Sequence, residues 1–390
     1  MRYPRAGRRA VLLAAAAAVS LLLTACQGSA PTKVSMPRSI GKGEGQLNLI
    51  TWEGYAESGS SDPKVDWVTP FEKKTGCEVS TTYVETAEDM VELMRDNADY
   101  YDGVSAPGRV AGTLIAEDLV APINVELIDG YGNLVPALQD APQVTAGGKR
   151  YGLPFLWELN TLTYNAEEVS PPPSSWAAIF NPERAARYGQ RLTLPDNPMT
   201  IAGAALYLQA HRPQLGITDP YTLTPRQLEA AVALLQRQRP SVKEYWSSYA
   251  EPLALYKSGG VVIGQARTHQ AQLLRADGQP IKSVLPAEGT TATSDSWMVS
   301  AQAPHPNRMY RWMNWTNSPK VQAQAAQWVG AAPANTETCQ YLAEGFCARH
   351  HVRDEEYLNK VYFHRTPCAR GERNCTDYET WSKRWTDVVE

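Results

Sequence analysis

From residue 46 onward, short apolar segments of strand character alternate with segments of helical spacing, and this alternation constrains the fold more than any other feature. Residues 47–52, 78–84 and 101–104 each predict a short strand. Between them, residues 88–97 carry apolar side chains at helical spacing, and Asp-Pro at the start of residues 62–71 predicts another helix. Strands that alternate with helices predict a mostly parallel sheet covered by helices on both faces.

A second series of such segments follows the first. Residues 151–157 and 162–165 predict two strands, and residues 260–265 predict a buried one. A helix is predicted after Thr224, because Gln227 stands three positions later, as in a capping box. The chain is long enough for two α/β domains of medium size.

The N-terminus has the character of a bacterial export signal. Four arginines accompany an apolar run at residues 10–23, which is too short to span a bilayer comfortably. The run ends in Leu-Thr-Ala-Cys, which resembles a lipobox, in which Cys26 becomes the lipidated first residue of the mature chain. We expect residues 1–25 to be removed after export by either the general or the twin-arginine route. Residues 26–45, rich in Gly, Ser, Pro and Lys, then form a flexible tether.

The predicted location is therefore outside the cytoplasm, with the protein anchored by lipid to the outer face of the cell membrane or lying in the periplasm. The chain has 37 Lys and Arg against 41 Asp and Glu, and loss of the four leader arginines raises the acidic excess to eight. That excess argues against nucleic acid as a partner and suits a cationic ligand. Because the sequence has no nucleophile elbow, zinc helix, P-loop or dinucleotide fingerprint, we expect neither enzymatic activity nor a cofactor.

Five cysteines follow the lipobox. In an exported protein, the close spacing of Cys339 with Cys347 and of Cys368 with Cys375 favours two local disulfides, although four cysteines allow three pairings. Cys77 is then left as a buried free thiol. No C-x-x-C spacing typical of zinc sites occurs, so no metal is expected.

Several longer segments occur in an order that is specific for one family. They include Trp-Glu-Gly-Tyr at 52–55, Pro-Gln-Leu-Gly-Ile-Thr-Asp-Pro-Tyr at 213–221, Pro-Ala-Glu-Gly at 286–289 and Arg-Trp-Met-Asn-Trp at 311–315. With these segments the chain resembles the spermidine/putrescine-type periplasmic binding proteins of ABC importers, in their polyamine-binding branch. The resemblance covers nearly the whole mature chain and is much less specific for the ligand than for the family.

The resemblance implies the two-lobed periplasmic-binding-protein fold of type II, in which the ligand is clamped between two α/β lobes. Each lobe is expected to have a mixed, mostly parallel sheet flanked by helices. The first lobe is expected at 46–156 and 293–333, and the second at 157–292 and 334–390. Such a protein acts as a monomer and delivers its ligand to the permease subunits of an ABC importer in the membrane.

A polyamine carries ammonium groups separated by methylenes, so its site needs carboxylates with flat aromatic walls between them. Trp52 and Tyr55 follow a predicted strand and match aromatic ligand contacts of the family, and Asp196 and Asp295 match carboxylates that bind the amine. The expected ligand-binding residues are Trp52, Glu53, Tyr55, Glu158, Asp196, Trp246, Arg267 and Asp295.

The chain also departs from the better-known spermidine binders. The differing aligned positions are Gly108, Val110, Met199, Gly264 and Thr293. Fewer carboxylates weaken the case for spermidine itself, and Arg267 or Arg109 could pair with a ligand carboxylate in a bidentate geometry. The main alternative to a polyamine is therefore an ω-amino acid such as γ-aminobutyrate. A sugar-binding protein of similar architecture is the alternative from another class.

Overall fold

A computed structural model describes residues 33–368 and 370–390, and the account below concerns the unit formed by residues 34–390. The predicted signal at 1–25 and the lipidation site at Cys26 lie outside the described residues. No helix within the described part of the chain combines the length and the apolar character that a membrane span requires.

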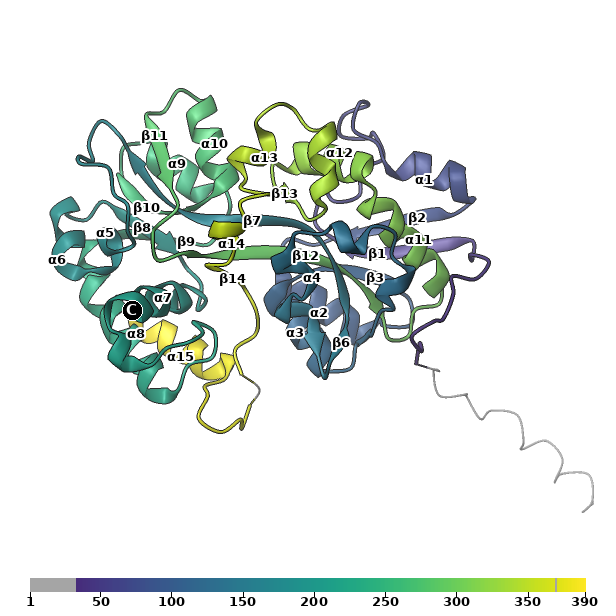
Figure 1. Ribbon diagram of the computed structural model, residues 1–390, viewed down its shortest axis with the longest axis horizontal. Coiled ribbons are helices and arrows are strands. Elements are labelled where there is room, and N and C mark those ends of the chain that lie inside the picture. Colours follow the sequence, from purple (N-terminus) through teal and green to yellow (C-terminus); the bar gives the residue numbers. More distant parts are fainter. Residues whose placement is uncertain (1–32, 369) are drawn as a thin grey trace, which may run out of the picture. The chain divides into compact units, whose positions relative to one another are not determined.

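One mixed sheet runs through this unit and connects two groups of helices (Figure 1). Its strand order is β2 (Glu78–Tyr83), β1 (Gln46–Thr51), β3 (Gly103–Pro107), β12 (Thr290–Ser300), β7 (Gly152–Asn165), β10 (Ile263–Arg267), β8 (Leu192–Pro195) and β9 (Val242–Trp246). The outer three strands at each end run parallel to one another, whereas β12 and β7 are antiparallel to their neighbours on this path. The sheet therefore has the α/β character predicted, with β7 and β12 linking a first lobe around β1–β3 to a second around β8–β10.

The long strand β7 replaces the two strands predicted at 151–157 and 162–165, and that prediction was wrong. Thirteen of its fourteen residues are buried, because other strands pair with it along its length and helices cover both faces. Its first half pairs with β12 and β13 (Ala332–Pro333), and its second half pairs with β10 and β11 (Ile281–Val284). A single strand thus spans both lobes.

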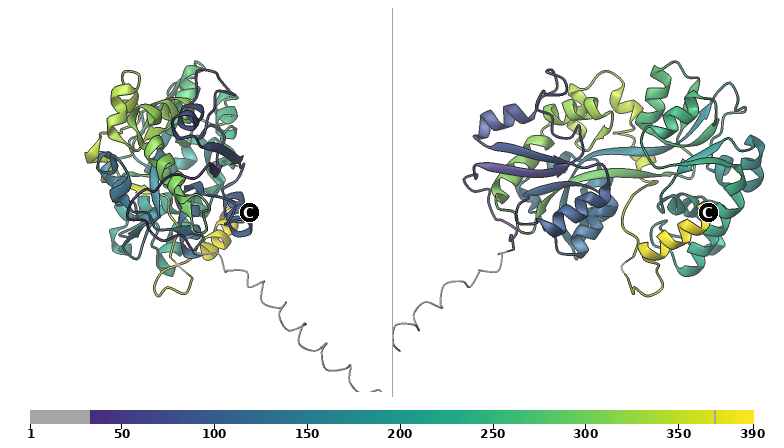
Figure 2. Two further views of the ribbon diagram at one scale, coloured as in Figure 1. Left: turned by 90° about the vertical axis from the view of Figure 1, so that its right-hand side faces the viewer. Right: turned by 180° about the vertical axis from the view of Figure 1, so that it is seen from behind.

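Helices pack on both sides of the long strands in each lobe, as the view from behind also shows (Figure 2). The main helices of the first lobe are α1 (Val68–Thr75), α2 (Ala87–Asp96), α3 (Gly108–Ala116), α11 (Pro306–Asn317) and α12 (Pro319–Val329). Those of the second are α7 (Thr200–His211), α8 (Pro225–Gln238), α9 (Glu251–Lys257), α10 (Thr268–Ala276) and α15 (Tyr378–Val389). Each lobe has its own aromatic core, with Trp297 against Trp312 in the first and Tyr221 against Trp381 in the second.

The local sequence correctly predicted how one helix is capped. The capping box of Thr224 and Gln227 is present at the start of α8, as predicted. The helix expected at 62–71 instead begins at Val68 and continues to Thr75. Pro70 is then the third helical residue, where the backbone N–H has no partner within the helix, so it causes no distortion. Gly76 ends the helix in the left-handed conformation, with φ 65°.

The C-terminal part of the chain passes from one core to the other. Phe346, Leu358 and Phe363 belong to the core of the first lobe, whereas α15 packs on the core of the second. The predicted lobe boundaries stay a prediction, and this packing favours a last boundary near residue 364 over one at 334. Disulfides join Cys339 to Cys347 and Cys368 to Cys375, and Cys77 is a buried free thiol.

Candidate functional site

Polar side chains from three central strands lie on one face of the sheet, where the two lobes meet. Glu158 and Asn160 are two positions apart on β7, so they point to the same face. Thr293 of β12 stands directly opposite Glu158, with Asp295 two positions further along. Arg267, at the end of β10, stands opposite Asn160. This register places two carboxylates and one guanidinium on a common surface.

The loop after β1 supplies aromatic side chains to the same place. The Tyr55 hydroxyl donates a hydrogen bond of 2.6 Å to Asp295 Oδ2, and the Trp52 indole nitrogen lies 3.5 Å from Asp295 Oδ1. Gly54, with φ 88°, allows the tight turn between these two aromatic residues, which the Tyr55 amide closes on the Trp52 carbonyl. Both ring systems therefore meet the carboxylate that the sequence predicts to bind the amine.

The electrostatics of this group favour the arrival of a cation. Burial raises the pKa of the Asp295 carboxyl, and the Tyr55 hydrogen bond, Arg267 and the Trp52 indole oppose that rise. Burial also raises the pKa of Glu158, against the effect of Arg267 at 3.6 Å and of the His269 amide at 3.2 Å. The partly desolvated carboxyls of Asp295 and Glu158 thus share the guanidinium of Arg267, so their two potential negative charges face one positive charge.

A cavity of about 120 Å³ opens from this face toward the second lobe. Its lining is Asn160, Pro195, Asp196, Asn197, Met199, Thr200, Trp246, Ser247, Gln265, Arg267, Thr293 and His364. Because Arg267 and Thr293 also belong to the polar face described above, the cavity adjoins the Asp295 group.

The second-lobe residues predicted from the sequence occupy its wall. Asp196 follows β8 and is exposed, and one of its carboxylate oxygens accepts a 2.7 Å hydrogen bond from the Trp385 indole. Trp246 is buried, and its indole nitrogen donates to the Gln265 carbonyl at 3.3 Å. Of the other predicted residues, Glu53 is exposed on the loop after β1 and Arg109 pairs with Glu88, and neither lines this cavity.

The sequence analysis missed several residues around the cavity. Asn160 follows Glu158 by two positions, so strand periodicity would have found it once β7 was known to be continuous. Tyr249 lies against Arg267, whose guanidinium carbon is 5.8 Å from the ring centroid. His364 comes from a distant segment, and no pattern in the sequence connects it with this site. Its pKa is lowered to about 3 by burial and by the two arginines Arg267 and Arg109, so its imidazole is neutral.

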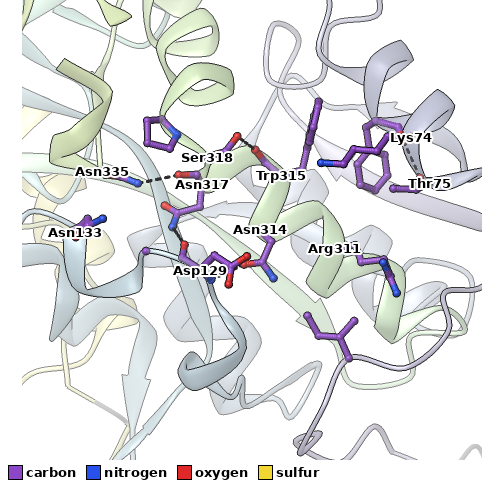
Figure 3. Close-up of a pocket in the computed structure, with 14 residues that line it drawn as sticks. Lys74, Thr75, Asp129, Asn133, Arg311, Asn314, Trp315, Asn317, Ser318 and Asn335 are labelled. Atoms are coloured by element: carbon purple, nitrogen blue, oxygen red, sulfur yellow. Dashed lines mark hydrogen bonds between the residues drawn. The ribbon is translucent and has the colours of Figure 1, made fainter. Parts of the chain in front are cut away.

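A larger cavity of about 540 Å³ lies elsewhere on the first lobe (Figure 3). Trp315 and Asn314 of α11 line it together with Lys74, and the Lys74 ammonium is 5.2 Å from the Trp315 ring centroid. Arg311 adds a second cation against the single carboxylate of Asp129, so the lining has a net positive charge that disfavours an amine. The cavity near Asp295 is therefore the candidate ligand site.

Comparison with known proteins identifies the family. The family model for bacterial extracellular solute-binding proteins matches residues 66–341. The spermidine/putrescine-binding periplasmic protein of Escherichia coli K12 is 27% identical over 299 residues, which are 76% of this chain and 80% of that protein. The putrescine/cadaverine-binding protein of Pseudomonas aeruginosa is 22% identical over 311 residues, covering 76% of this chain and 81% of the relative. These relatives are solute-binding proteins and not enzymes, in agreement with the sequence analysis.

Solved structures show the same fold at low identity. The spermidine/putrescine ABC transporter substrate-binding protein of Streptococcus pneumoniae superposes with a TM-score of 0.71 at 18% identity, covering 88% of this chain and 97% of that one. The structure of the Atu4243-GABA receptor superposes with a TM-score of 0.67, also at 18% identity, covering 88% and 98%. The two-lobed fold predicted from the sequence is thereby confirmed.

Proposed function

Because the chain belongs to the bacterial extracellular solute-binding proteins, we propose that it captures a small organic amine of the polyamine class for an ABC importer. The observation that carries the proposal is the carboxylate of Asp295 held by Tyr55 and Trp52, with Glu158 on the same face of the sheet. An ammonium group paired with such a carboxylate contributes about 1.5–3 kcal/mol. An aromatic face over the cation adds about 0.5–2 kcal/mol.

Arg267 supports a second candidate, an ω-amino acid such as γ-aminobutyrate. Its guanidinium lies 3.6 Å from Glu158 and lines the cavity, where it could bind a ligand carboxylate through two parallel hydrogen bonds. The ammonium end of the same ligand would then lie at Asp295. In this arrangement the ligand ammonium group pairs with Asp295 and the ligand carboxylate pairs with Arg267.

We infer further that residues 1–25 direct export, that Cys26 carries a lipid anchor, and that the protein acts as a monomer at the outer face of the membrane or in the periplasm. The two disulfides support an oxidising compartment. Closure of the lobes around the ligand would distinguish the loaded from the empty form, and the permease subunits would recognise the loaded one.

The test is a thermal-shift screen of the mature protein, followed by calorimetric titration of the ligands that stabilise it. The panel contains putrescine, spermidine, γ-aminobutyrate, choline, common amino acids and sugars. A ligand at 100 times its Kd stabilises the protein by about 2.7 kcal/mol, which is a clear shift. Stabilisation by an amine or an ω-amino acid supports the proposal, and stabilisation by sugars alone contradicts it.

A further inference from the structure

Residues 361–368 cross from the first lobe to the second beside the candidate site, and we call this segment the cleft strap. It begins as β14 (Val361–Phe363), which pairs in parallel with residues 290–292 of β12. From there the chain runs between α3 on one side and α7 and α15 on the other (Figure 1 and Figure 2). The His364 amide continues the pairing by donating to the Ala292 carbonyl at 2.7 Å.

Two glycines of α3, in the first lobe, allow the cleft strap to pack closely against that helix. A Cβ atom at Gly108 would overlap the His364 carbonyl oxygen, and one at Gly112 would overlap the Thr366 hydroxyl. The two glycines are four positions apart on α3, so they form a smooth stripe on one face of that helix. The Thr366 hydroxyl donates a 2.7 Å hydrogen bond to the carbonyl of Arg109 in the same helix. This close approach accounts for Gly108, one of the departures from the spermidine binders.

The second lobe holds the cleft strap through side chains and a covalent bond. Arg365 forms an ion pair with Asp219, and its guanidinium carbon is 5.8 Å from the centroid of the Tyr221 ring. The His364 ring meets the same tyrosine edge-on, with ring centroids 5.9 Å apart. The disulfide from Cys368 to Cys375 fixes the end of the strap near the start of α15. The strap therefore contacts both lobes.

The cleft strap approaches the sheet near the position of Asp295. Asp295 stands opposite Pro107 in the sheet, and Gly108, which the strap covers, is the next residue. The strap therefore lies on the start of α3, next to the strand end that stands opposite Asp295. The ring of His364 also lines the cavity that contains Arg267 and Thr293. A ligand that extended from Asp295 toward the covered face of Gly108 would meet the backbone of His364.

We propose that the cleft strap limits the length of the ligand, so that this protein selects short α,ω-diamines or short ω-amino acids over longer ones. This inference rests on the proposed function, because it specifies which members of the proposed ligand class fit. A cavity of about 120 Å³ agrees with a compact ligand, since sites for drug-sized molecules hold about 300–1,000 Å³.

The test compares ligand length in the wild type and in two proteins with a displaced strap. Gly112→Ala pushes the Thr366 side chain away from α3, and the double variant Arg365→Ala/Thr366→Ala removes both polar anchors. Gly132→Ala is the matched control, because nothing lies within 4 Å of the added Cβ. Calorimetry measures the Kd of diamines and ω-amino acids with three to five carbons, and of spermidine.

In the wild type we expect the affinity to fall for the longest ligands, by at least about tenfold, since one misplaced methylene changes binding by that amount. Both strap variants should reduce this difference at least severalfold, and the control should keep it. Equal affinity for short and long ligands in the wild type would overturn the inference, as would an unchanged length preference in both strap variants.

A second readout needs no ligand and keeps the two proposals separable. Hydrogen exchange followed by mass spectrometry should show slow exchange for the peptide containing residues 361–368, and faster exchange in the double variant. If no amine or amino acid binds the wild type, the proposed function fails. Exchange of this peptide at the rate of an unfolded chain would instead refute the strap itself.

Discussion

The Tyr55 hydroxyl donates a hydrogen bond of 2.6 Å to Asp295, which joins the loop after β1 to the crossing strand β12. The two residues are 240 positions apart in the sequence: Tyr55 lies in the loop after β1, and Asp295 lies within β12, opposite Pro107 at the end of β3. Burial and the nearby Asp295 charge raise the pKa of Tyr55 well above its usual range, so the phenol stays a neutral donor. The carboxylate is thereby oriented before any ligand arrives.

Substitution of Asp295 by Asn should therefore remove most of the affinity for the ligand. The amide keeps the size of the side chain but loses the charge that pairs with an ammonium group. We expect Kd to rise about 10- to 100-fold, which corresponds to the loss of one charge-assisted interaction. Calorimetric titration with the best ligand of the screen measures the change.

Asp99→Asn is the matched control, because Asp99 is exposed just before β3, at the opposite end of this strand from Pro107, the partner of Asp295. It removes the same charge from the protein without touching Asp295, and we expect less than a twofold change in Kd. Equal losses in the two variants would mean that overall charge, and not the Asp295 carboxylate, attracts the ligand.

Binding of a cation should release protons. Burial raises the pKa of Asp295 and Glu158, so each carboxyl takes up its proton at a higher pH in the free protein than an exposed carboxyl would. An ammonium ligand favours the ionised form and lowers both pKa values on binding. The ligand therefore binds with full affinity above the raised pKa values of these two carboxyls in the free protein. Its affinity falls as the pH drops through those values. Titration in buffers of different ionisation enthalpy measures the proton count, and binding that takes up protons would contradict the prediction.

Much of the site was predictable from residue type and strand position. Trp52 and Tyr55 follow β1 and meet Asp295 of β12 opposite the end of β3, at the carboxyl ends of parallel strands, where ligands bind in open α/β sheets. Gly264 shows why one of the positions that differ from the spermidine binders carries no side chain. A Cβ atom there would overlap the Thr193 carbonyl oxygen of the neighbouring strand β8, so packing dictates a glycine.

Other features depend on contacts that local patterns do not encode. The break expected between residues 157 and 162 does not occur, because partner strands on both sides keep β7 extended through both lobes. His364 reaches the cavity only because Gly108 and Gly112 allow the backbone near it to approach α3. A glycine in a helix has several possible causes, and its sequence position does not identify the segment that covers it.

Replacement of Arg267 by Gln should distinguish the two candidate ligand classes. If the ligand is an ω-amino acid, loss of the guanidinium removes the partner of its carboxylate, and Kd should rise about tenfold or more. If the ligand is a diamine, the same change removes a repulsive charge next to Glu158, and Kd should fall. Arg275→Gln, at the exposed end of α10, is the control for net charge. An unchanged Kd for both ligand classes would show that Arg267 does not face the ligand.

The free energy of unfolding should fall in acid because a histidine is buried where α10 packs against the first lobe. His350 is 1% exposed, stacks on Phe346 and lies 3.1 Å from the Gln272 amide nitrogen of α10. Burial, together with the charges of His269, Arg349 and His351, lowers its pKa from 6.5 to about 3. The folded protein therefore binds fewer protons than the unfolded chain between these two values. As the pH falls from 6.5 toward 3, this group removes about 1.4 kcal/mol of stability per pH unit.

Urea denaturation at pH 7.5 and at pH 4.5 measures the effect in the wild type and in His350→Gln. The glutamine does not titrate, so the variant should lose about 2–3 kcal/mol less than the wild type between the two pH values. His211→Gln is the control, because His211 lies at the surface of the second lobe and its charge does not act on His350. The buried His364 is present in all three proteins and contributes equally to each. If His350→Gln has the same acid sensitivity as the wild type, His350 is already protonated in the folded protein. Water must then reach His350 where α10 packs against the first lobe.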